Sequence, residues 1–333
     1  MTTFPITLLF SDGAARRIDA QDGESVVAAA TAAGLNLLTD CNNGQCGTCT
    51  ATLVSGGLEL GHYDRAVLPD SDRADGTVLT CVSRVTGPCV VEFPYDLSEA
   101  TAEEPPPIEG RVLAVERVAE ETVRLKVEIS APMVFEPGQY VRMRPAGGSD
   151  WRSYSMASVP GATTLVFFIR LVDGGSFSTW LTGSAKAGEI LELSHPHGSF
   201  FLRDESRPRL FVAGGTGLAP FLSMLESISE IEKERAIPTA LLLGVRTGAH
   251  LFALAQLAAL REKLPALQVR FAAELDPAED CHAGYATDLI GSLGLDASTR
   301  IYLCGPPPMV EAGRTAAESS GLARKDMLCE RFN

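Results

Sequence analysis

Residues 41–49 read CNNGQCGTC, which places Cys41, Cys46 and Cys49 in the pattern C-x4-C-x2-C. A fourth cysteine, Cys81, comes 32 positions after Cys49. Four thiolates hold a [2Fe–2S] cluster with this spacing. A long chain without a secretion signal keeps its thiols reduced, which favours a cluster over disulfides. The sequence therefore predicts that these four cysteines are metal ligands.

The loop between the cysteines is made of small residues, as a cluster requires. Gly44, Gly47 and Thr48 let the backbone wrap closely and donate N–H groups to negatively charged sulfur atoms. Structural zinc is the alternative. It is weaker because structural zinc usually takes two paired C-x2-C motifs, whereas this sequence has one.

Composition and charge limit the classes of protein that fit. The chain has 333 residues, 45% of them hydrophobic, so two or three domains with ordinary cores are expected. The formal net charge is −14, and residues 1–100 hold 13 acidic and 5 basic side chains. Such an acidic chain is unsuited to nucleic acid. Its acidic first third could steer it toward a basic protein surface, although a merely solubilising surface explains the charge equally well.

Nothing in the sequence indicates export or membrane insertion. The N-terminus has no cationic start followed by a long apolar run, so no signal peptide is expected. Glycine and proline interrupt the most apolar stretches before they reach the roughly 18 residues of a membrane span. We therefore expect a cytoplasmic protein with no membrane span.

The chain divides into segments with different patterns. Residues 98–109, SEATAEEPPPIE, combine four acids with three consecutive prolines, so we place an extended linker at 98–107, after a first domain at 1–97. Strand-like runs separated by glycine and proline fill residues 108–205 and predict an antiparallel β-barrel. Residues 206–333 alternate strand-like and helical runs, which predicts a doubly wound α/β domain with a parallel sheet.

Two motifs stand in the predicted barrel. Residues 152–158 read RSYSMAS, with the form R-x-Y-S-x-x-S, and the stretch GGSFSTWL begins at Gly174. An arginine can pair bidentately with a pyrophosphate, a tyrosine ring can stack beside an isoalloxazine, and a serine can hydrogen-bond the reactive flavin nitrogen. A glycine-rich turn that opens a helix offers N–H groups to phosphate. Alone, R-x-Y-S could also be an ordinary strand with alternating polar residues.

A glycine-rich turn opens the last domain. Residues 212–220 read VAGGTGLAP, follow a strand-like run and enter a helical one. Glycines there let the backbone approach a pyrophosphate, and the helix N-terminus favours its charge. A tight structural turn is the alternative. The candidate binding positions are Gly214, Gly215, Thr216 and Gly217.

These motifs resemble two known families. Residues 1–97 resemble plant-type ferredoxin domains, which implies a β-grasp α+β fold. Residues 108–333 resemble the ferredoxin–NADP reductase superfamily, because R-x-Y-S and G-x-x-S-x-x-L stand at the distance expected there. That resemblance implies bound FAD and assigns seven positions to it. They are Arg152, Tyr154 and Ser155 in the flavin motif, Gly175 and Ser178 in the pyrophosphate turn, and Ile169 and Arg170 on the adenosine side.

The same resemblance assigns the nicotinamide side. The superfamily motif C-G-P-x-x-M corresponds to Cys304 and Gly305 onward, and the cysteine would shape the pocket for hydride transfer. Arg246 lies where the family contacts the adenosine ribose. As the single basic residue of its loop, it favours NADH over NADPH. Phe332 would cover the flavin ring until nicotinamide displaces it, and Glu330 would lie near the cysteine. A disordered tail is the alternative.

The domain order resembles the reductase components of benzoate- and anthranilate-type aromatic ring-hydroxylating dioxygenases. It implies an NADH-dependent iron–sulfur flavoprotein reductase. FAD would take a hydride, Ser155 would stabilise the reduced flavin, and the [2Fe–2S] cluster would pass single electrons to a terminal oxygenase. The nearest alternative is the reductase of a diiron monooxygenase of the methane, phenol or toluene hydroxylase type. Further alternatives are a reductase that serves a sugar dehydration and a redox sensor, although the complete C-G-P-P-P-M motif disfavours the sensor.

Overall fold

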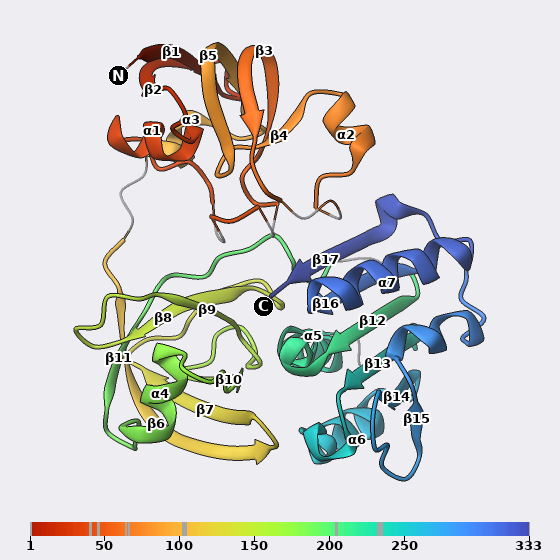
Figure 1. Cartoon of the computed structure of the whole chain (residues 1–333). Helices are drawn as coiled ribbons and strands as arrows, with labels where there is room; N and C mark the ends of the chain where they lie inside the picture. Colours follow the sequence, from red (N-terminus) through yellow and green to blue (C-terminus); the bar gives the residue numbers. More distant parts are fainter. Residues whose placement is uncertain are drawn as a thin grey trace. The chain divides into compact units, whose positions relative to one another are not determined.

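The chain forms two compact units, Met1–Glu104 and Pro105–Asn333 (Figure 1). The fold is that of a computed structural model. The residues described are 2–39, 42–44, 47–63, 65, 67–101, 105–203, 206–231 and 236–332.

The first unit is a mixed sheet with one main helix. Its five strands have the order β2-β1-β5-β3-β4, in which β1 and β5 run parallel and the other neighbours antiparallel. Helix α1 (Val26–Ala32) buries Val26, Ala29 and Ala30 in the core, and the Ser25 hydroxyl caps it by accepting the Ala28 N–H. The strands are β1 (Thr3–Leu9), β2 (Ala15–Gln21), β3 (Thr50–Leu60), β4 (Thr77–Leu79) and β5 (Ser83–Glu92). The α+β fold expected for this region is confirmed.

The segment expected to be a linker, residues 98–107, begins inside a helix. Helix α3 (Leu97–Thr101) buries Ala100 fully in the core of the first unit. The carbonyl oxygen of Ala100 accepts the Asn36 N–H at 2.8 Å. The first unit therefore continues beyond residue 97, because one apolar residue of the acidic stretch is held by packing and by a backbone hydrogen bond. A second short helix, α2 (Asp70–Ala74), precedes β4.

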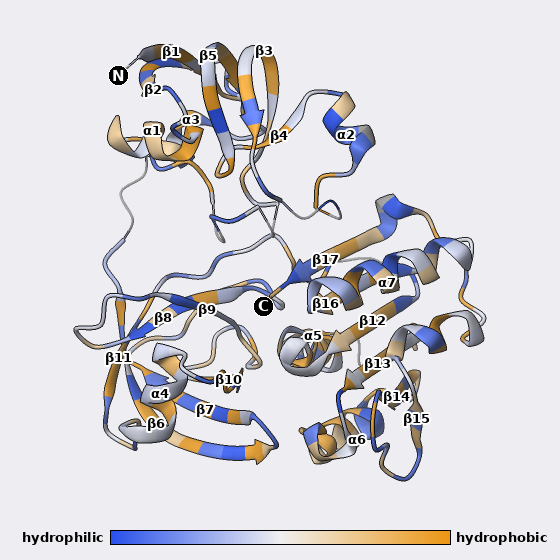
Figure 2. Cartoon of the chain, in the orientation of Figure 1, coloured by the Kyte–Doolittle hydropathy of each residue, from blue (hydrophilic) through white to orange (hydrophobic). Residues whose placement is uncertain are grey.

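The second unit begins with an antiparallel barrel. Its six strands have the order β10-β7-β6-β11-β8-β9, and all neighbours are antiparallel. The segment after β9 returns to β10, where the Ala157 N–H donates to the Val166 carbonyl at 2.8 Å. Figure 2 shows hydrophobic and hydrophilic residues alternating along β7, whose apolar side chains fill the barrel. The strands are β6 (Ile108–Ala119), β7 (Thr122–Ile129), β8 (Tyr140–Pro145), β9 (Arg152–Ser155), β10 (Thr164–Arg170) and β11 (Ile190–Leu193).

A parallel sheet completes the second unit. Its six strands have the order β15-β14-β13-β12-β16-β17, and all neighbours are parallel (Figure 1). Side chains alternate along each strand, so Phe211 and Leu241 pack with α5 and α6, while Leu210 and Leu242 pack with α7. The strands are β12 (Arg209–Gly214), β13 (Thr239–Val245), β14 (Leu267–Ala273), β15 (Cys281–Ala283), β16 (Arg300–Gly305) and β17 (Met327–Arg331). The helices are α5 (Leu218–Ile231), α6 (Leu254–Lys263) and α7 (Pro307–Ser319). The doubly wound α/β domain is confirmed.

The barrel and the parallel sheet share a core cluster. The ring of Phe168 in the barrel packs against the ring of Phe252 in a tilted arrangement, with centroids 4.8 Å apart. Phe200, which follows the barrel strands, meets Phe221 of α5 at 5.9 Å. These contacts hold the two domains of the second unit together. No helix in the described part of the chain is long and apolar enough to cross a bilayer.

Candidate functional site

One carboxylate joins side chains from both domains of the second unit. The Ser155 Oγ, at the end of β9, donates to Glu330 Oε2 of β17 at 3.0 Å. The Cys304 Sγ of β16 lies 3.6 Å from the same oxygen. The resemblance to the reductase superfamily implied that Glu330 lies near Cys304, and the structure also brings Ser155 to Glu330, from which it is 175 positions away in the sequence.

Strand pairing explains why these groups converge. Cys304 and Glu330 are register partners in the parallel pair of β16 and β17. On the barrel side, Ser155 pairs with Tyr140 of β8. A Cβ atom added to Gly198, whose φ is 100°, would lie 2.9 Å from the Tyr140 ring and 3.9 Å from Glu330 Oε1. A glycine at this turn therefore leaves room for both the ring and the carboxylate.

The thiol of Cys304 stays protonated in this setting. Its side chain is fully buried, and burial followed by the charge of Glu330 raises its pKa well above the ordinary value. A thiol is a weak nucleophile until it ionises. A buried, protonated thiol is thus a poor nucleophile, and its role in shaping the pocket stays a prediction.

The glycine-rich turn packs against Cys304 and is open on its other side. After Gly214 ends β12, the 3₁₀ turn η1 (Gly215–Gly217) leads into α5. A Cβ atom at Gly217 would lie 2.2 Å from the carbonyl oxygen of Cys304, so a side chain cannot fit there. A Cβ atom at Gly215, whose φ is 53°, would meet nothing within 4 Å. That open side of a helix-opening turn suits the close approach of a pyrophosphate.

The arginine of the flavin motif is accessible. The side chain of Arg152 is 51% exposed, and its Nη2 lies 3.6 Å from Asp150. Its Nη1 also donates to the Trp151 carbonyl at 3.0 Å. An ion pair this long and exposed is weak, so it does not prevent the guanidinium from meeting a phosphate.

The tyrosine and the pyrophosphate turn of the flavin motif lie on neighbouring elements. The Tyr154 ring packs against Phe177 of α4 (Ser176–Gly183), with centroids 5.1 Å apart. Burial raises the pKa of Tyr154, so its phenol stays neutral. Gly175 precedes α4, and the Ser178 hydroxyl accepts the Val172 N–H at 2.9 Å. This hydrogen bond fixes the turn whose backbone was expected to face phosphate.

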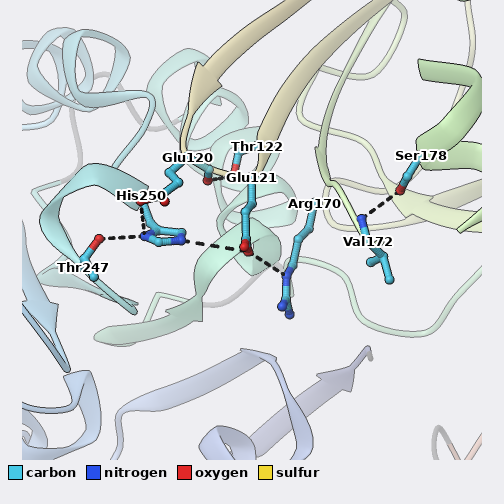
Figure 3. Close-up of polar contacts among 8 residues, drawn as sticks. All are labelled: Glu120, Glu121, Thr122, Arg170, Val172, Ser178, Thr247 and His250. Atoms are coloured by element: carbon cyan, nitrogen blue, oxygen red, sulfur yellow. Dashed lines mark hydrogen bonds and ion pairs between the residues drawn. The ribbon is translucent and has the colours of Figure 1, made fainter. Parts of the chain in front are cut away.

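The two residues expected on the adenosine side of FAD point in different directions. Ile169 is buried in the barrel core, at 1% exposure, so its side chain is not available to a cofactor and its backbone alone could make contact. The side chain of Arg170, the next residue of β10, is 62% exposed and lies 3.7 Å from Glu121 (Figure 3). Alternation along the strand separates the two.

Two of the four expected cluster ligands are described. The Cys49 and Cys81 sulfur atoms lie 3.2 Å apart, farther than the roughly 2.05 Å of a disulfide. The Thr80 N–H and hydroxyl both bond the Cys49 carbonyl, which holds the neighbouring Cys81 close to it. This pair of thiols fits two ligands of one cluster. Cys41 and Cys46 lie outside the described residues.

The C-terminal residues form part of the sheet. β17 covers residues 327–331, and the Phe332 N–H donates to the Gly305 carbonyl at 3.3 Å. The Phe332 ring is half-buried against the core of the second unit. Residues 327–332 therefore lie beside the cysteine motif as a sheet strand and the residue that follows it.

Sequence reasoning missed an acidic residue at the carboxyl edge of the parallel sheet. Glu274 follows β14, and its N–H donates to the Val245 carbonyl at 3.1 Å. The next N–H, of Leu275, donates to the carbonyl of exposed Arg246 at 2.8 Å. The Glu274 carboxylate accepts the Tyr285 hydroxyl at 3.1 Å, which raises the pKa of that tyrosine. An acid directly after a strand of a nucleotide-binding sheet is the signal that could have identified it.

Three protein families match successive parts of the chain. They are the 2Fe-2S iron-sulfur cluster binding domain at residues 9–86, the oxidoreductase FAD-binding domain at 109–202 and the oxidoreductase NAD-binding domain at 211–315. Together with the thiol pair, the accessible arginine and the open glycine turn, they define an iron–sulfur flavoprotein reductase that uses FAD and NAD.

Relatives match over the whole length. The toluate 1,2-dioxygenase electron transfer component of Pseudomonas putida is 35% identical, over 99% of this chain and 98% of that protein. The anthranilate 1,2-dioxygenase electron transfer component of Acinetobacter baylyi is 34% identical, over 98% and 96%. A propane 2-monooxygenase reductase component of Mycolicibacterium goodii is 30% identical, over 95% and 94%. The chain belongs to the family of these electron transfer components.

A solved structure agrees with this fold. The crystal structure of Amycolatopsis cytochrome P450 reductase GcoB matches with a TM-score of 0.74 and 28% identity, over 98% of both chains.

The first prediction concerns the contact between the glycine turn and Cys304. We expect Gly217→Ala to lower kcat/KM for NADH by about tenfold or more, because the new methyl group must displace the Cys304 backbone. Steady-state reduction of ferricyanide by NADH measures this. Gly183→Ala is the matched control, since a Cβ atom there meets nothing within 4 Å. Equal activity of the two variants would contradict the prediction.

Proposed function

We propose that this protein takes electrons from NADH and passes them, through FAD and a [2Fe–2S] cluster, to the terminal oxygenase of an aromatic ring-hydroxylating dioxygenase. The observation that best supports this proposal is the Glu330 carboxylate, which contacts Ser155 of the barrel and Cys304 of the parallel sheet where these two domains meet. The 2Fe-2S domain of the same chain supplies a single-electron carrier. We expect the reaction to take place in the cytoplasm, where thiols stay reduced.

The names of the relatives favour a dioxygenase partner. Electron transfer components of toluate and anthranilate dioxygenases reach 35% and 34% identity over nearly the whole chain. The propane monooxygenase component reaches 30%. We therefore propose an oxygenase that acts on an aromatic acid as the partner, in preference to a diiron monooxygenase.

The residues of the site have separate tasks in this proposal. When bound, FAD accepts two electrons together as a hydride and releases them one at a time. Ser155 presents a hydroxyl that can hydrogen-bond the flavin, and Glu330 holds this hydroxyl in place and can exchange a proton with it at 3.0 Å. The neutral Cys304 thiol and the half-buried Phe332 ring occupy space beside the carboxylate and limit the entry of water.

The remaining candidate residues would bind the pyrophosphates of the two nucleotides and the iron–sulfur cluster. Arg152 and the turn at Gly175 and Ser178 would hold the FAD pyrophosphate. Gly215 and Thr216 would hold the NADH pyrophosphate on the open side of η1. Cys49 and Cys81, together with Cys41 and Cys46, would hold the cluster.

Glu274 gives a physical reason for the NADH preference. It lies beside the loop of Arg246, at the edge of the sheet where the adenosine ribose of a dinucleotide binds. A carboxylate can accept hydrogen bonds from ribose hydroxyls, whereas it would repel the 2′-phosphate of NADPH. We therefore propose that Glu274 selects NADH.

Anaerobic titration of the purified protein with NADH tests the electron route. We expect bleaching of the flavin absorbance together with the EPR signal of a reduced [2Fe–2S] cluster. Oxidised cytochrome c or a purified oxygenase component would then accept the electrons. Flavin bleaching with no cluster signal would refute the proposed route.

A serine substitution tests the carboxylate site. We expect Ser155→Ala to slow flavin reduction by NADH about tenfold or more, because the hydroxyl held by Glu330 is lost. Stopped-flow absorbance under anaerobic conditions measures this rate. Ser153→Ala, an exposed position on the same strand, should keep the wild-type rate. The assignment fails if both variants reduce flavin at that rate.

A charge substitution tests the choice of nucleotide. We expect Glu274→Gln to raise the ratio of kcat/KM for NADPH over NADH by about tenfold, since a like charge no longer faces the 2′-phosphate. Glu262→Gln removes the same charge from an exposed position on α6 and should leave the ratio unchanged. An unchanged ratio in Glu274→Gln would show that the preference has another source.

A further inference from the structure

The turn between β6 and β7 contacts both nucleotide-binding regions of the second unit. The Glu120 N–H donates to the Ala249 carbonyl at 3.0 Å, in the 3₁₀ turn η2 (Gly248–His250) that follows β13. The Glu121 carbonyl accepts the Leu171 N–H at 2.7 Å, directly after β10. Glu121 adopts a left-handed conformation, with φ of 58°. The turn is therefore held between a strand of the barrel and a loop of the parallel-sheet domain.

His250 occupies the loop side of this contact. Its side chain is 15% exposed, and its Nδ1 lies 2.8 Å from the Thr247 hydroxyl and 3.7 Å from Glu120 Oε2. Its Nε2 lies 3.9 Å from Glu121 Oε2 (Figure 3). Thr247 follows Arg246, the residue expected at the adenosine ribose of NADH. Two carboxylates of the barrel turn thus face a histidine that supports the NADH loop.

Glu121 also contacts the FAD side. The same oxygen, Oε2, lies 3.7 Å from Arg170 Nε. Figure 3 shows the outer end of the Arg170 guanidinium pointing away from Glu121. Among the described residues only Glu121 pairs with this arginine. Glu121 therefore holds the inner edge of the guanidinium and leaves its outer nitrogens for a ligand.

The strand that carries Arg170 continues into the pyrophosphate turn. Two residues later, the Val172 N–H donates to the Ser178 hydroxyl at 2.9 Å (Figure 3). The Glu121 carbonyl bonds Leu171 between them. The backbone and side chain of Glu121 thus act on the same short segment that was assigned to FAD.

We propose that Glu121 is a positioning residue for both nucleotides, which orients Arg170 toward the adenosine end of FAD and steadies the His250 loop for the adenosine end of NADH. The inference rests on the FAD and NADH sites of the proposed function. One carboxylate oxygen lies 3.7 Å from the Arg170 guanidinium on one side and 3.9 Å from the His250 ring on the other, so the two nucleotide affinities are linked through it. Such a linkage is reciprocal for binding free energies.

Glu120 provides a matched control on the same turn. Its carboxylate lies 3.7 Å from His250. Among the described residues Arg170 pairs with Glu121 and not with Glu120. The side chain of Glu120 is 55% exposed and that of Glu121 is 41% exposed, so both substitutions act on partly solvated carboxylates. Glu→Gln at either position keeps the shape and removes the charge.

The experiment compares Glu121→Gln, Glu120→Gln and the wild type as FAD-loaded full chains. Serial dilution with FAD fluorescence gives the Kd of FAD, and NADH-dependent ferricyanide reduction with excess FAD gives KM and kcat. Exposed ion pairs are weak, so we expect Glu121→Gln to raise the FAD Kd and the KM for NADH about threefold each, with kcat within about 1.5-fold of the wild type. Glu120→Gln should leave the FAD Kd unchanged.

Three outcomes would overturn the inference: an unchanged FAD Kd in Glu121→Gln, equal FAD Kd values in both variants, or a loss of kcat at saturating FAD and NADH. Thermal unfolding by circular dichroism checks that both variants are folded. A wild-type protein that retains no FAD and does not oxidise NADH would refute the proposed function itself. If the wild type is active but Glu121→Gln and Glu120→Gln give the same values, the role of Glu121 is refuted while the proposed function stands.

Discussion

The Glu330 carboxylate accepts hydrogen bonds from Ser155 of the barrel and from Cys304 of the parallel sheet, and so lies where two domains with their own cores meet. A carboxylate in such a half-buried place needs donors, and both of these come from elements that must be correctly packed. The last strand, β17, supplies the carboxylate because it pairs with β16 in register. Strand β17 is therefore part of the site, and the contact of its Glu330 with Ser155 depends on the docking of the barrel against the sheet.

Further contacts, distant from the Glu330 carboxylate, also hold the barrel against the parallel-sheet domain. The rings of Phe168 and Phe252 pack in a tilted arrangement with centroids 4.8 Å apart, and the Glu120 N–H donates to the Ala249 carbonyl. Hydride transfer depends steeply on the distance and orientation of the two reacting groups, so a rigid junction between a flavin domain and a nicotinamide domain has a direct functional value. The pocket also contains a neutral thiol, since burial and Glu330 both raise the pKa of Cys304. Together these features favour a site built to align cofactors, with the redox chemistry left to the cofactors.

The sequence predicted the fold class and the family correctly, because both depend on local patterns. Alternation and glycine spacing indicated a barrel and a parallel sheet, and the order of motifs indicated a ferredoxin domain joined to a reductase. Two details needed the structure. Ala100 is buried, so the acidic segment expected as a linker begins as a helix of the first unit. Ile169 faces the barrel core, so its side chain cannot serve FAD. Glu121 and Glu274 belong to no motif, and sequence reasoning passed over both.

The sequence by itself was enough to predict the cluster loop and the phosphate-binding turn, because each needs particular residue types at short, fixed separations. These are Cys41, Cys46 and Cys49 in the first case and the glycines of residues 214–217 in the second. Contacts between distant positions were decided only by tertiary structure. Ser155 and Glu330 are 175 positions apart, and Glu121 meets both a strand and a loop that follow it much later in the chain. Hydrophobic periodicity specifies which face of a helix or strand is buried, but not which other element covers that face. The packing of one element on another is what places these polar groups within reach of one another.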